Sequence, residues 1–68
     1  MGRSGAIIYL MERRRAWFEK IAATSSGNVE LESAQIELIE RLVLDIRAGR
    51  VRAFELKHPN PVAVFVTD

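Results

Sequence analysis

The chain is short and contains no cysteine, and together these two features restrict what it can fold into. It has 68 residues and cannot form a disulfide, whereas a typical domain has roughly 100–200 residues. A chain of this size without a disulfide or a metal must be a small, densely packed domain or part of an oligomer. Because 49% of the residues are hydrophobic and 28% are charged, a disordered linker and a collagen-like repeat are excluded. We therefore expect one small domain over residues 1–68.

Residues 6–24 are predicted to form a first helix. At about 100° per residue, the apolar side chains of this segment fall on one broad arc. The arc is wider than the stripe that a surface helix needs. Although Ile7, Ile8 and Tyr9 also favour a strand, the helical period is the better interpretation. The arc comprises Ala6, Ile7, Ile8, Leu10, Met11, Trp17, Phe18, Ile21 and Ala22.

A second helix is predicted over residues 31–48, after a turn at residues 24–28. If Glu32 caps this helix, Gln35 stands at the capping-box position. Gly49 is a typical C-terminal stop, and Arg47 faces the negative end of the helix dipole. The apolar stripe of this helix comprises Leu31, Ile36, Leu38, Ile39, Leu42, Val43 and Ile46.

The last part of the chain changes to a strand period and predicts a β-hairpin over residues 50–67. Two strand-like segments are joined by residues 58–61, where Pro59 and Asn60 suit the centre of a β-turn. The fold class is therefore α+β, a two-helix hairpin followed by a C-terminal β-hairpin. A lone two-stranded hairpin is marginal in water, so it must pack on the helices or extend across a symmetry axis. We expect homodimerisation to complete the fold.

Charge is distributed unevenly along the chain although the formal net charge is only +1. Residues 1–28 carry five basic and two acidic side chains, whereas residues 29–49 carry two basic and five acidic ones. Proteins held on nucleic acid by phosphate contacts usually have a much larger basic excess. The pattern instead indicates that the first and second segments attract each other, within one chain or across a dimer.

The residue types that carry catalysis or bind metals do not form a recognisable group. His58 stands in a Pro-flanked loop without a second histidine or a cysteine, whereas a metal site needs three or four ligands. Turn and cap roles account for the nucleophile candidates Thr24, Ser25, Ser26 and Ser33. We therefore expect no enzymatic activity, no cofactor and no metal.

The apolar run at residues 6–11 is too short for a signal-peptide core or for a membrane span. On this basis we expect a cytoplasmic location and no membrane partner.

Several side chains depart from the simple amphipathic pattern and are candidates for self-association or partner contact. Arg14 lies in the middle of the first apolar arc, and an unpaired charge does not enter a core. It therefore reaches the rim of the arc, or it pairs with an acidic residue of the second helix or of a partner. Leu44 lies on the polar side of the second helix. The complete set of candidates is Arg14, Arg15, Trp17, Leu44, Val62, Val64 and Val66.

The last strand is apolar on both faces, with Val62, Val64 and Val66 on one face and Ala63 and Phe65 on the other. Such a strand needs cover on both sides, or it is an edge strand with small residues outward. The adjacent aromatics Trp17 and Phe18 are both expected to pack in the core.

The expected function is that of a small non-catalytic regulatory or inhibitor protein, which binds another protein as a homodimer. Its size and lack of chemistry are typical of the modulators of host machinery that phages and mobile elements carry. Two alternatives remain open, a nucleic-acid-binding module that uses the basic first helix and a nucleotide-binding sponge at a dimer seam. Both would use Arg13, Arg14 and Arg15 for phosphate contacts. The acidic second helix disfavours the first alternative, because phosphates would repel it.

Overall fold

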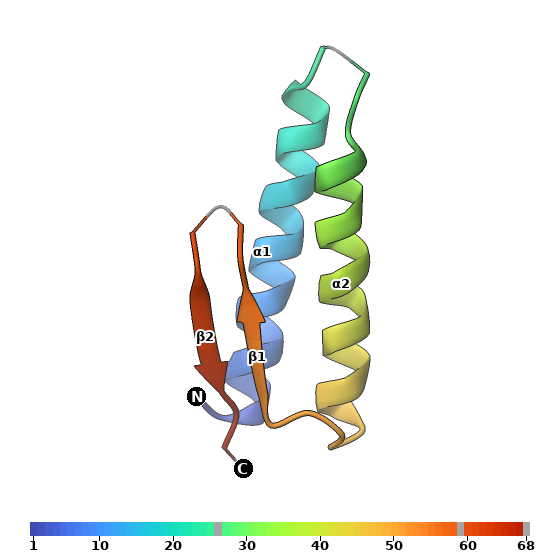
Figure 1. Cartoon of the computed structure of the whole chain (residues 1–68). Helices are drawn as coiled ribbons and strands as arrows, with labels where there is room; N and C mark the ends of the chain where they lie inside the picture. The colour runs from blue at the N-terminus through green and yellow to red at the C-terminus, as the bar shows by residue number, and fades with distance from the viewer. Residues whose placement is uncertain (26, 59, 68) are drawn as a thin grey trace.

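The computed structural model describes residues 1–25, 27–58 and 60–67, and it contains two helices followed by a two-stranded antiparallel sheet. Helix α1 spans Arg3–Ala23, helix α2 spans Glu30–Arg47, strand β1 spans Ala53–Leu56 and strand β2 spans Val62–Phe65. The helices run antiparallel, and the hairpin lies beside the half of the helix pair that is far from the α1–α2 turn (Figure 1). The predicted α+β fold is confirmed.

Helix α1 begins at Arg3, earlier than the predicted residue 6, so Ile7, Ile8 and Tyr9 are helical. Its N-cap is Gly2, which has an extended conformation and makes no side-chain capping bond. At the other end, the Thr24 hydroxyl donates a hydrogen bond of 2.8 Å to the Lys20 carbonyl oxygen. Thr24 therefore satisfies a carbonyl that α1 leaves unpaired at its last turn.

Helix α2 begins at Glu30, and its N-cap Val29 makes no side-chain capping bond. The condition under which Gln35 would stand at the capping-box position is therefore not met, because Glu32 is not the N-cap. Glu32 instead lies in the first turn with Glu30, where carboxylates interact favourably with the positive end of the helix dipole. The helix ends at Arg47, and Gly49 adopts a left-handed conformation with φ of 75°. The predicted role of Gly49 as the C-terminal stop is confirmed.

Alanine substitutions at Gly49 and Gly5 are expected to change stability in opposite directions. At Gly49 a Cβ atom would be no closer than 4.0 Å to its nearest neighbour, so the left-handed backbone alone should lower the free energy of unfolding by about 1 kcal/mol. Gly5 lies inside α1, where an added Cβ atom would lie 3.4 Å from the Cγ atom of Met1, and alanine there should raise the free energy of unfolding by about 0.5–1 kcal/mol. Urea unfolding followed by circular dichroism measures both. An increase for Gly49→Ala would contradict the left-handed helix end described here, and a decrease for Gly5→Ala would contradict the open space at that position of α1.

The strands are shorter than the predicted segments, and each has four residues. They pair antiparallel with Ala53 opposite Phe65 and Leu56 opposite Val62. Of the two residues predicted at the centre of the β-turn, Pro59 lies outside the described residues. Arg50 stabilises the connection from α2, because its guanidinium donates to Oδ1 of Asp45 at 2.9 Å and 3.1 Å.

The two ends of the chain pair with each other, which the sequence analysis did not predict. Gly2 and Thr67 form a parallel β-bridge, and the Thr67 amide donates to the Met1 carbonyl oxygen at 2.7 Å. The Met1 ammonium donates to the Phe65 carbonyl oxygen at 3.2 Å. The N-terminal residues therefore continue the sheet along the outer edge of β2, and they tie the start of α1 to the hairpin.

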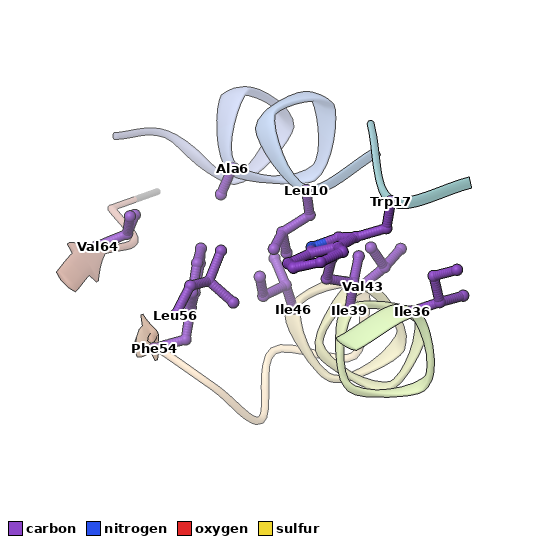
Figure 2. Close-up of a cluster of buried hydrophobic side chains, with 10 residues drawn as sticks. All are labelled: Ala6, Leu10, Trp17, Ile36, Ile39, Val43, Ile46, Phe54, Leu56 and Val64. Atoms are coloured by element: carbon purple, nitrogen blue, oxygen red, sulfur yellow. The ribbon is translucent and has the colours of Figure 1, made fainter. Parts of the chain in front are cut away.

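The core lies between three elements, α1, α2 and the hairpin (Figure 2). Leu10 of α1 and Ile39 and Ile46 of α2 are the largest fully buried side chains. Among the described residues, the buried set is entirely apolar and comprises Ala6, Leu10, Trp17, Ile36, Ile39, Val43, Ile46, Phe54, Leu56 and Val64.

Parts of both predicted apolar faces lie outside this core. Leu31 and Leu38 of the second stripe are exposed, as are Ile8, Met11 and Phe18 of the first arc. Each apolar face is wider than the part of the helix that is buried, because each helix packs against the rest of the fold on only part of its circumference. These side chains are therefore available to cover further surface.

Candidate protein-interaction surface

Arg14 connects the two helices. Its Nη2 and Nε atoms lie 2.9 Å and 3.0 Å from Oε2 of Glu40 in α2, and its guanidinium carbon lies 4.8 Å from the centre of the Phe18 ring. This confirms the interpretation in which Arg14 pairs with an acidic residue of the second helix. The pair stays at the surface, since the side chains are 32% and 48% exposed. Both charges therefore remain in contact with water, and the desolvation penalty of a buried ion pair is avoided.

Large apolar side chains surround this ion pair. Met11 and Phe18 lie three residues before and four residues after Arg14, on the same side of α1, and they are 44% and 45% exposed. From α2, Leu44 is 62% exposed and lies four residues after Glu40, on the same side of its helix. A groove between the helices is lined by Met11, Arg14, Glu40, Val43, Leu44 and Arg47. We call this region, together with Phe18, the helical face.

The helical face points away from the β-hairpin. Arg13 donates a hydrogen bond of 2.9 Å to the His58 carbonyl oxygen at the tip of the hairpin. Arg14 is the next residue, about 100° further round the helix, and it reaches α2 instead. The hairpin and the helical face therefore lie on different sides of α1, and the groove residues all come from α1 and α2.

The three consecutive arginines do not converge on one point. Arg13 donates to the His58 carbonyl oxygen, and Arg14 pairs with Glu40. The Nε atom of Arg15 lies 3.4 Å from Oε1 of Glu19, one turn along α1. Each has a partner within the chain, so a phosphate would have to compete with these contacts at every position.

Trp17 lies in the core, with 5% of its surface exposed. The Lys20 ammonium lies 5.1 Å from the centre of its ring and covers the outer side. The expected core role of Trp17 is therefore confirmed, whereas its neighbour Phe18 lies on the helical face. Trp17 has little surface left for contact with another molecule.

The valines of the last strand face inward. Val64 is buried, and Val62 and Val66 pack against the core with part of their surface exposed. The opposite face of the strand carries Phe65, which is 73% exposed and lies opposite Ala53 in the sheet. Phe65 is a candidate contact residue that the sequence analysis did not select. The sequence did contain a signal for Phe65 as a contact residue, namely its position on the second apolar face of the last strand.

We call the exposed side of the hairpin the outer sheet face; it carries Phe65, Ala53 and Ala63 together with the charged Glu55, which lies opposite Ala63. It lies on a different element from the helical face, so the two surfaces are separate. Among the described residues, β1 has a strand neighbour on one edge only.

In the part of the chain that the structure describes, no group of three or more His, Cys, Asp or Glu side chains could hold a metal ion. Neither α1 nor α2 is long and apolar enough to cross a membrane. Comparison with protein-family models, with curated proteins and with solved structures finds no match for this chain.

Proposed function

We propose that this chain is a non-catalytic regulatory protein, which acts as a homodimer by binding another protein. The observation that carries the proposal is the presence of large exposed apolar side chains on two separate surfaces, the helical face and the outer sheet face, of so small a chain. One surface can join two copies while the other remains free for a different protein.

The amount of exposed surface supports this proposal. The accessible surface is 4805 Å², whereas a compact monomer of 7.7 kDa is expected to expose about 4,300 Å². The molecule is elongated, with extents of 41 × 20 × 15 Å. Contact with another chain would cover the excess, and this burial is the main favourable contribution to association.

The composition of both surfaces also supports protein binding. Phenylalanine, methionine and arginine are enriched at protein interfaces, and isolated charges are depleted at their centres. The helical face has Met11, Phe18 and Leu44 around a charge-neutral pair, and the outer sheet face has Phe65 at one end, diagonal to Glu55. A nucleic-acid surface would require basic side chains free to reach phosphates, whereas Arg13, Arg14 and Arg15 are already engaged.

Affinity purification from a host extract tests the function. The wild type is compared with Phe65→Asp, which places a charge on the outer sheet face, and with Ser4→Asp, an exposed polar site in the first turn of α1. We expect the wild type and Ser4→Asp to enrich the same protein, and Phe65→Asp to lose at least about 30-fold in affinity for it, the effect of a hot-spot residue. The activity of that protein should then change when the purified chain is added.

The same purification at about 0.1 M and about 0.5 M salt separates the alternatives, because only exposed charge contacts are strongly screened. Protein binding through Phe65 should survive the higher salt concentration. Recovery of nucleic acid that disappears at high salt, with no protein enriched over Phe65→Asp, would overturn the proposal in favour of the nucleic-acid-binding alternative.

A further inference from the structure

The helical face has a charge pattern that complements itself. In the groove, the central charge of α1 is the basic Arg14 and that of α2 is the acidic Glu40, while the basic Arg47 lies two turns further along α2. Arg14 and Glu40 already form a contact within the chain, and both of its distances involve Oε2 of Glu40. The second oxygen, Oε1, can therefore accept a hydrogen bond from another guanidinium. A surface that presents a basic group on one helix beside an acidic group on the other, at the same height, fits a rotated copy of itself.

We infer that a second copy of this chain covers the helical face, with α1 of each protomer packed on α2 of its partner. This inference rests on the homodimer of the proposed function and specifies its interface. The result is a four-helix bundle in which every neighbouring pair of helices is antiparallel, with the β-hairpins on the two outer sides. Two Arg14–Glu40 pairs meet at its centre and form a layer of four charges with no net charge.

The direction of the two-fold axis follows from the heights of the side chains along the helices. An axis parallel to the helices leaves every residue at its own height and exchanges α1 with α2. Met11 and Leu44 share one groove, so Met11 of one protomer would meet Leu44 of the other in a single apolar layer. Arg14 would likewise meet the partner copy of Glu40. An axis perpendicular to the helices would instead pack α1 on its own copy and bring basic side chains together, which is unfavourable.

The size of the helical face is sufficient for this contact. Helix α2 has 18 residues and is therefore about 27 Å long. Two adjacent helices, each about 10 Å in diameter, then present on the order of 600 Å² per protomer. This area lies at the lower end of stable interfaces, which bury about 600–1,000 Å² on each partner.

Light scattering after size exclusion tests the interface with three purified proteins at about 100 μM, a concentration well above the micromolar dissociation constants of weak dimers. The wild type should have twice the monomer mass of 7.7 kDa. Leu44→Asp should have the monomer mass with unchanged helical circular dichroism, because an unpaired carboxylate would be buried in the apolar layer. Phe65→Asp should remain a dimer, since the outer sheet face takes no part. A monomeric wild type, or a dimer lost in Phe65→Asp and kept in Leu44→Asp, overturns the inference.

Charge reversal provides a second test that does not depend on Leu44. Arg14→Glu should weaken the dimer at least about 30-fold, since four carboxylates would then meet in the central layer. Adding Glu40→Arg to the same chain should restore the dimer. If Arg14→Glu leaves the dissociation constant of the dimer unchanged, the central layer is not at the interface.

The absence of cysteine makes the arrangement of the helices directly measurable by cross-linking. A mixture of Met11→Cys chains and Leu44→Cys chains should form disulfides between the two types, because α1 lies on α2 of the partner. Each variant alone should cross-link much more slowly, since identical helices lie on a diagonal of the bundle, too far apart for disulfide geometry. Rapid cross-linking of Met11→Cys to itself would show that α1 packs on α1 and would overturn the inference.

Failure of the bundle can be distinguished from failure of the proposed regulatory function. A monomeric chain that still captures a protein through Phe65 removes the bundle and the homodimer but leaves protein binding intact. A cross-linked bundle that captures no other protein would support the homodimer and remove the proposed regulatory binding.

Discussion

Replacing Trp17 with alanine should lower the free energy of unfolding by about 3–5 kcal/mol, the range found when a buried tryptophan is truncated. The side chain is the largest in the core and extends from α1 across the helix interface toward α2 (Figure 2). Because the chain has only 68 residues, a loss of this size is comparable with its entire expected stability. We therefore expect the variant to be largely unfolded at room temperature.

The neighbouring residue provides the control. Phe18→Ala removes an aromatic ring of similar chemistry that lies on the helical face, so it should cost the folded protomer less than about 1 kcal/mol. Guanidinium unfolding followed by circular dichroism measures both variants. It should be repeated at several protein concentrations, because dimer formation adds a concentration-dependent term. Equal losses for the two variants would contradict the assignment of Trp17 to the core and Phe18 to the surface.

The order of the elements could be predicted from the sequence because local signals specify it. The apolar stripe of the second helix, with Ile39, Val43 and Ile46 at its centre, is a strong helical period, and Gly49 marks its end. The hairpin follows from the change to a period of two. Each of these signals lies within one element, and therefore does not depend on the rest of the fold.

Features that depend on contacts between distant residues could not be predicted in this way. The pairing of Gly2 with Thr67 joins the two ends of the chain, and no local pattern in the sequence links the two residues. Gly2 is also the N-cap of α1, which begins at Arg3, earlier than predicted. Such positions are determined by tertiary packing, which overrides local propensity.

The candidate surface was predicted in part, for a related reason. Arg14 and Leu44 interrupt an otherwise regular pattern, and both lie on the helical face. Periodicity shows that Val64 and Phe65 lie on opposite faces of a strand, but not which face is buried. The face with three valines packs inward, and the single large ring of Phe65 lies outside.

The second large effect compares two leucines with very different surroundings. Leu10→Ala should lower the free energy of unfolding by about 2–5 kcal/mol, because Leu10 is completely buried between the helices. Leu44→Ala should leave the stability of the protomer within about 0.5 kcal/mol, since most of its surface is exposed. The two changes remove the same atoms, so the difference measures burial alone. Denaturant unfolding at low protein concentration, where a dimer is dissociated, gives both values.

The same two variants separate folding from association. If the helical face joins two copies, Leu44→Ala should weaken the dimer in light scattering while the helical circular dichroism stays intact. Leu10→Ala should reduce both together, because a protomer that unfolds cannot present the face. A Leu44→Ala variant that loses as much protomer stability as Leu10→Ala would place Leu44 inside the fold. In that case the surface on which the homodimer depends would not exist.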